Sequence, residues 1–233
     1  PVTVACSAER GFKLSPDDLE AAITAKTKWL ILNSPSNPTG AAYTAAELRA
    51  LASVLARHPH VYVMTDDMYE HLVYDGFAFT TIAQVAPELH DRTLTVNGVS
   101  KAYAMTGWRL GYAAGPKELI KIMSNIQSHT TSNSTSFVQY AAVEALNGDQ
   151  SFIPELNKEF KNRRDYMIGR ADQVEGLGYI YPKGAFYLML DIRPFIGKTY
   201  KGKTIENSLD FADQLLSDYL VALVPGSGFG LEG

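Results

Sequence analysis

Residues 93–111 read TLTVNGVSKAYAMTGWRLG and place a lysine directly after a short apolar run. That run, Thr93–Asn97, has the length of a β-strand, and Arg109–Ala114 is a second run of the same kind. Lys101 lies between the two, and Arg109 follows it by eight residues. The stretch therefore predicts two strands whose connection carries two basic side chains.

Further strands and helices are predicted on either side of this stretch. Two more apolar runs of strand length come earlier, at Lys28–Asn33 and Val61–Asp66. Helix starts are indicated by proline in a first turn and by a capping box, at Ser15–Asp18, at Thr44 with Glu47, and at Pro116. Strands that alternate with helices favour an α/β fold, with a mostly parallel sheet and helices on both of its faces.

The pattern changes after Gly148, where a smaller α+β part is predicted. The sequence favours a long helix over about residues 150–174, an apolar run at Gly184–Asp191, a polar surface insertion over 191–207, a helix near Ser208–Asp218 and a strand at Leu220–Val224. We therefore expect one domain to include residues 1–150, and residues 151–233 to hold an interdomain helix and part of a second domain.

Composition narrows the classes of function. The formal net charge of −4 shows no basic surface, so nucleic acid is not an expected partner. Cys6 is the single cysteine, which excludes an intrachain disulfide and a cysteine metal cluster, and no metal site is predicted. No apolar run reaches the roughly 18–20 residues of a membrane span, so no membrane association is expected. The expected location is the cytoplasm.

Polar side chains follow three of the predicted strands. Asn37 lies in the turn after the first, Asp66 and Tyr69 at the end of the second, and Lys101 after the third. Ligands of parallel sheets bind beyond the carboxyl ends of the strands. Each residue alone has an ordinary reading: a solvated lysine, a turn asparagine, a helix-capping aspartate. Their joint placement on one edge favours a functional site.

One chemistry uses all of these groups. A lysine amine can form a Schiff base with an aldehyde cofactor, and a carboxylate can keep a pyridine nitrogen protonated. A phenol and an amide can stabilise a phenolic oxygen, and a guanidinium can grip a phosphate.

Three motifs resemble those of the class-I aminotransferases, which are fold-type-I enzymes dependent on pyridoxal phosphate. They are Asn33–Gly40 (NSPSNPTG), Thr65–Glu70 (TDDMYE) and Gly98–Gly111 (GVSKAYAMTGWRLG), in the family's order and spacing. The resemblance extends over essentially the whole chain and is greatest to bacterial aspartate aminotransferases of subgroup I-beta, some of which also use prephenate. Residues 1–150 would then be part of the large, cofactor-binding domain.

The resemblance implies a role for each candidate residue. Lys101 would carry pyridoxal 5'-phosphate as a Schiff base and shuttle the proton, while Asp66 pairs with the ring nitrogen. Tyr69 and Asn37 would bind the phenolic oxygen, and Arg109 the phosphate. Gly184–Tyr187 resembles a segment that lines the substrate pocket, although an apolar core strand is an equally good interpretation. The turn at Asn37–Pro38 is expected to contain a cis peptide bond.

The implied reaction converts L-aspartate and 2-oxoglutarate into oxaloacetate and L-glutamate, and the implied assembly is a homodimer with sites at the subunit interface. Aminotransferases of prephenate, aromatic, alanine or branched-chain specificity stay open, as does a non-catalytic ligand-binding domain of a regulator. The resemblance also implies that the chain is a central-to-C-terminal segment, with a phosphate loop and a ring-stacking aromatic before Pro1 and a carboxylate-binding arginine after Gly233.

Overall fold

A four-stranded sheet organises the first part of the chain in the computed structural model, which describes residues 1–230. Its strands are β1 (Trp29–Asn33), β2 (Tyr62–Asp66), β3 (Thr93–Gly98) and β4 (Gly111–Ala114), in that spatial order. The first three are parallel and β4 is antiparallel to β3. The predicted α/β class with a mostly parallel sheet is confirmed.

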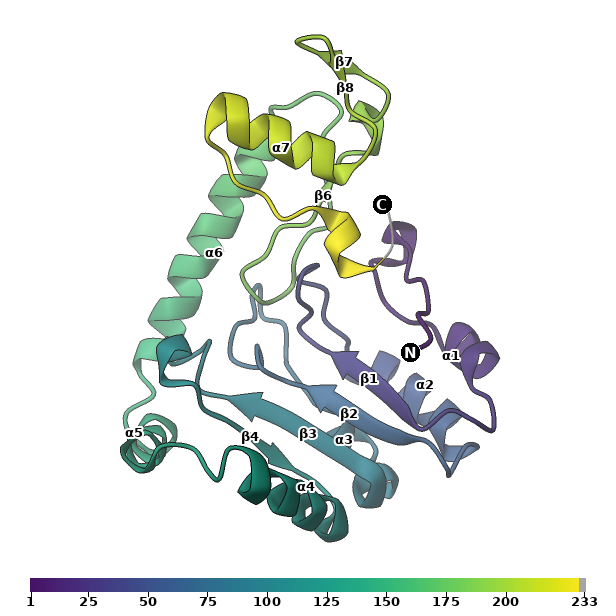
Figure 1. Ribbon diagram of the computed structural model, residues 1–233, viewed down its shortest axis with the longest axis vertical. Helices are drawn as coiled ribbons and strands as arrows, with labels where there is room; N and C mark the ends of the chain where they lie inside the picture. The colour runs from purple at the N-terminus through teal and green to yellow at the C-terminus, as the bar shows by residue number, and fades with distance from the viewer. Residues whose placement is uncertain (231–233) are drawn as a thin grey trace.

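Short helices pack against one face of this sheet. They are α1 (Pro16–Ala22), α2 (Ala45–Ala56), α3 (Ile82–Val85) and the 3-10 helix η2 (Pro87–Arg92). All three predicted helix starts are confirmed. The Ser15 hydroxyl accepts from the Asp18 amide at 3.1 Å, Thr44 forms a capping box with Glu47, and Pro116 is the N-cap of the helix that begins at Lys117. In Figure 1, α2 and α3 lie behind the sheet.

The core lies between these helices and the sheet. Leu32 of β1 and Val63 of β2 pack with Leu51 and Leu55 of α2, and all four are buried. Each such side chain contributes about 1.5–3 kcal/mol relative to exposure. On the opposite face Trp29, Ile31 and Tyr62 are exposed, so the helical cover among the described residues is concentrated on one side.

Longer helices lead from the sheet to the second part of the chain. They are α4 (Lys117–Thr130), α5 (Ser136–Asn147) and α6 (Phe152–Ala171). The long helix predicted for about 150–174 is α6, which rises along one side of the molecule toward α7 (Ser208–Tyr219) in Figure 1. No helix within residues 1–230 is long and apolar enough to cross a bilayer.

The second part has little sheet. Two hairpins consist of β5 (Gly178–Tyr179) with β6 (Leu190–Asp191) and β7 (Thr199–Tyr200) with β8 (Lys203–Thr204). Two further 3-10 helices are η4 (Arg193–Phe195) and η5 (Gly226–Phe229). The division into residues 1–150 and 151–233 stays a prediction.

The strand predicted at Leu220–Val224 was wrong, and the structure also shows no core strand at Gly184–Tyr187, which was one of two open interpretations. Of Gly184–Asp191 only the last two residues are in a strand, and 220–224 is irregular. Leu220 is in the left-handed conformation, at φ 57°, where it ends α7, so the following residues turn away from a strand path. Gly184–Ala185 packs on the 34–41 turn and on Leu72. Apart from an isolated bridge between Gly184 and Val73, residues 184–189 are used for packing and not for strand pairing.

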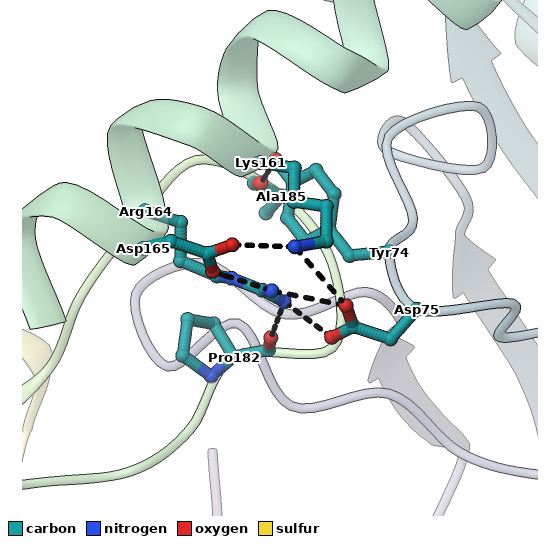
Figure 2. Close-up of polar contacts among 7 residues, drawn as sticks. All are labelled: Tyr74, Asp75, Lys161, Arg164, Asp165, Pro182 and Ala185. Carbon is teal, nitrogen blue, oxygen red and sulfur yellow. Dashed lines mark hydrogen bonds and ion pairs between the residues drawn. The ribbon is translucent and has the colours of Figure 1, made fainter.

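A buried arginine joins α6 to the edge of the sheet (Figure 2). The Arg164 guanidinium grips both carboxylate oxygens of Asp75, at 2.7 and 3.1 Å, and donates to Asp165 of its own helix and to the Pro182 carbonyl. It lies between the rings of Tyr74 and Tyr181, 4.9 and 4.6 Å from their centroids. Its side chain is 5% exposed. We call this group the Arg164 cluster.

We expect Arg164→Met to lower the free energy of unfolding by about 3 kcal/mol, because it removes a buried guanidinium with its ion pairs and two cation–π contacts. The neighbouring Arg163 is the matched control, since its pair with Glu159 is solvated, with side chains 66% and 54% exposed. Arg163→Met should cost under about 1 kcal/mol. Denaturant unfolding of both variants in the full-length protein measures this, and equal losses would refute the cluster's role.

Candidate active site

The carboxyl ends of β1, β2 and β3 lie side by side and carry the candidate residues. Asn33 pairs with Asp66 in the register of the two strands, and Asp66 pairs with Val96 of β3. Asn33 braces this edge, since its side-chain amide donates to the Asp66 carbonyl at 3.0 Å and its side-chain oxygen accepts from the Asn37 amide at 2.7 Å. The turn that carries Asn37 is thereby fixed next to the end of β2.

The turn after β1 has the predicted geometry. The Asn37–Pro38 peptide bond is cis, as expected, and Ser34–Pro35 is cis as well, which the sequence did not predict. Asn37 is exposed, and its side-chain amide makes no hydrogen bond to residues 1–230. It is therefore available to a ligand.

Asp66 and Asp67 point to opposite sides of the sheet. Asp67 continues the buried face of Val63 and Thr65, and its carboxylate accepts from the Thr65 hydroxyl at 2.6 Å. Asp66 is on the other face, where one carboxylate oxygen accepts from the Met68 amide at 3.1 Å. Its other oxygen accepts no hydrogen bond within residues 1–230. Of the two carboxylates, only Asp66 can reach a ligand.

Lys101 follows β3 and lies among aromatic rings. Its Nζ is 6.0 Å from the Tyr69 centroid and 5.8 Å from that of Phe186. The residue is half-buried, and within residues 1–230 its amine has neither a carboxylate partner nor a hydrogen bond. A lysine in this position is uncommon, because buried ammonium groups are almost always paired.

Arg109 ends the 3-10 helix η3 (Thr106–Trp108) just before β4. It has a left-handed conformation, at φ 54°, which is unfavourable for a residue with a side chain. The exposed guanidinium donates to the Thr106 carbonyl at 3.0 Å and forms no ion pair within the described chain. Four of its N–H groups stay free for an anion.

Tyr69 is buried, and its hydroxyl lies 2.5 Å from the hydroxyl of Tyr187. Burial raises the pKa of Tyr69 well above its usual range, and the hydrogen bond to Tyr187 raises it further. The phenol is therefore neutral at physiological pH and can donate a hydrogen bond.

The structure brings Lys101 and Tyr69 into contact, and joins Asn37 to Asp66 through Asn33. Arg109 is not hydrogen-bonded to any of the other four. Sequence reasoning missed the roles of Asn33 and Tyr187. Asn33 has a local signal, as an asparagine at a strand end before a turn. Tyr187 lies in the segment that resembles a pocket lining, but its bond to Tyr69 has no local signal, since the two residues are 118 apart.

Comparison with known proteins identifies the family. The family model described as "Aminotransferase class I and II" matches residues 1–233. The chain belongs to this family. The aspartate/prephenate aminotransferase of Cereibacter sphaeroides is 58% identical over 233 residues, which are 100% of this chain and 58% of that protein. The chain thus spans about 58% of the length of a curated relative it matches.

Solved structures have the same fold. The aspartate aminotransferase of Rhizobium meliloti is 55% identical with a TM-score of 0.97, over 100% of this chain and 58% of that one. The aromatic aminotransferase of Pyrococcus horikoshii is 39% identical with a TM-score of 0.91, over 100% and 60%. Enzymes named for different substrates therefore share this backbone.

Members of this family use pyridoxal phosphate. The donor set of the site fits that group. Within residues 1–230 the Lys101 amine, the Asn37 side-chain amide and one Asp66 carboxylate oxygen have no hydrogen-bond partner. The Arg109 guanidinium uses one of its donors, on the Thr106 carbonyl. For the half-buried Lys101 and Asp66 this is uncommon, because half-buried polar groups usually find partners in proteins. An amine can join an aldehyde, a guanidinium can bind a phosphate, and a carboxylate can pair with a protonated ring nitrogen.

The buried Asp67 carboxyl makes the stability of the fold depend on pH. Burial raises the pKa of its carboxyl to about 6, and the nearby Glu70 and Asp66 carboxylates add to the rise. Because the folded pKa lies above the unfolded value of 3.8, the folded state holds the proton more tightly. Asp67 therefore favours folding below about pH 4, and this contribution is lost as the pH rises to about 6.

In the wild type we expect the free energy of unfolding to fall by about 3 kcal/mol between pH 4 and 6.5, and we expect Asp67→Asn to abolish this fall. The uncharged amide can still accept from Thr65 but does not titrate. Asp17→Asn, at an exposed position in α1, is the control and should leave the pH profile of the wild type unchanged. Denaturant unfolding at a series of pH values measures both. An unchanged profile in Asp67→Asn would contradict the prediction.

Proposed function

We propose that the protein containing this chain is a pyridoxal-phosphate-dependent aminotransferase that transfers the amino group of L-aspartate to 2-oxoglutarate. The observation that carries the proposal is the half-buried, unpartnered Lys101 amine at the carboxyl edge of the sheet. The names of the relatives support aspartate as the amino donor.

When bound, pyridoxal phosphate supplies an aldehyde that joins amines and a ring that takes up the electron pair left when a Cα–H bond breaks. The chain's own residues would hold it in place. Arg109 binds the phosphate, Asp66 accepts from the ring nitrogen, and the Tyr69 hydroxyl and Asn37 amide donate to the ring oxygen.

Lys101 would act as the base and acid. Its Nζ takes the proton from the substrate's α carbon and returns it at the next stage. The rings of Tyr69 and Phe186 lie 6.0 and 5.8 Å from the amine and cover part of it. A site with less water strengthens each of these hydrogen bonds.

Prephenate is a second candidate substrate. The Cereibacter sphaeroides relative is named for both aspartate and prephenate. Because the P. horikoshii enzyme with the same fold is named for aromatic substrates, the backbone alone does not distinguish these specificities. Assays of the full-length protein with 2-oxoglutarate and with prephenate as acceptors separate them.

We expect borohydride reduction of the full-length holoenzyme, followed by peptide mapping, to find the cofactor on Lys101. Lys101→Ala should abolish the label. Lys198→Ala is the matched control, because Lys198 also faces an aromatic ring, 5.0 Å from the Phe195 centroid. Asp66→Asn should keep the label on Lys101 and lose on the order of 10²–10⁴ in transamination rate. Label on another lysine would overturn the proposal.

A homodimer is the proposed assembly. Large apolar side chains on α4 and α5 are exposed in the chain, at Ile122, Ile126, Phe137, Tyr140 and Val143. Exposed apolar surface of this extent is typical of a protein interface. The exposed polar segment 131–135 between the two helices would lie at the edge of that interface.

The cytoplasm stays the expected compartment, which cell fractionation tests.

We expect full-length protein to sediment as a dimer and Tyr140→Glu to shift it toward the monomer, because a charge would be buried at the interface. Lys158→Glu, at an exposed position of α6, is the control and should leave the dimer intact. A monomeric wild-type protein would refute the assembly.

A further inference from the structure

A pair of tyrosines joins two distant parts of the chain at the site. The hydroxyls of Tyr69 and Tyr187 are 2.5 Å apart, and their rings meet edge to face with centroids 5.7 Å apart. Tyr187 also packs on the small apolar cluster that contains Tyr69, Leu72 and Ala185. The contact is therefore both polar and packed, which limits the freedom of both rings.

The segment that carries Tyr187 is fixed by its backbone. The Ala185 amide donates to the Leu72 carbonyl at 2.9 Å, and the Tyr74 hydroxyl donates to the Ala185 carbonyl. Gly184 lies so close to Pro35 that a Cβ there would be 2.6 Å from the proline ring. Figure 2 shows Ala185 beside Tyr74 and the Arg164 cluster. Tyr187 thus follows directly after a tightly held turn.

Two phenols that share one hydrogen bond must divide the roles of donor and acceptor. If Tyr69 donates to Tyr187, its single hydrogen is used and cannot reach a ligand. If Tyr187 donates, the Tyr69 hydrogen is free and is made a better donor by the bond it accepts. An anionic ligand oxygen can only accept, so it favours the second arrangement.

We propose that Tyr187 is a positioning residue that donates its hydrogen to the Tyr69 hydroxyl and so directs the Tyr69 hydrogen to the ring oxygen of the bound cofactor. This inference rests on the proposed function. Tyr187 acts only through Tyr69, and its effect is to stabilise negative charge on that oxygen.

The test is the pH midpoint of the absorbance change of the bound cofactor in full-length holoenzyme. A donated hydrogen bond stabilises the charged oxygen, so a weaker bond raises the midpoint. Tyr187→Phe should raise it by about 0.5–1 unit, as expected for partial loss of one hydrogen bond. Tyr179→Phe is the matched control, since it removes a hydroxyl that bonds Asp172. Its midpoint should equal that of the wild type.

A double-mutant cycle separates positioning from a direct effect. Tyr69→Phe alone should raise the midpoint further than Tyr187→Phe, and adding Tyr187→Phe to it should cause no additional shift. An unmoved midpoint in folded Tyr187→Phe, or additive shifts in the double variant, would overturn the inference while the proposed function stands. Wild-type protein without a cofactor absorbance band would overturn both. Equal melting temperatures of the variants show that the fold is intact.

Discussion

The burial of one guanidinium constrains much of this structure. Arg164 has almost no exposed surface, so each of its donors must find an acceptor within the protein. Those acceptors come from three places: Asp75 after β2, Asp165 on α6, and the Pro182 carbonyl. Moving α6 away from the segments that hold Asp75 and Pro182 would leave the buried guanidinium without two of its three acceptor groups, which is costly. The long helix is thereby held to the edge of the sheet where the ligand groups lie.

The same constraint extends into the site through a few residues. Pro182 is followed by Gly184 and Ala185, which pack on Pro35 and Leu72, and then by Phe186 and Tyr187. The ring of Phe186 stacks on Phe160 of α6, with centroids 5.3 Å apart. The wall that faces Lys101 is therefore built by residues distant in sequence and aligned by packing.

What could be predicted from the sequence was local. The strand ends, the two caps and the cis bond before Pro38 each depend on residues within a few positions of one another. The bond between Arg164 and Asp75 joins residues 89 apart, and no pattern along the chain indicates it. For the apolar run at 184–191 a core strand and a pocket-lining segment stayed open, because apolar residues indicate burial and not whether a partner strand exists. The motifs around Lys101 identified the family, which the comparisons confirmed.

Side chains alternate along β2, so the two adjacent carboxylates at its end face opposite sides of the sheet. Thr65 and Asp67 face the helices, while Asp66 faces the ligand side. Removing one residue from this strand would exchange them: Asp66 would enter the core and Asp67 would take the ligand position. Each carboxylate would then lie on the wrong face of the sheet, even though the residue types at this edge were kept. Over evolution this strand can accept substitutions at many positions, but a change of its length by a single codon would be eliminated.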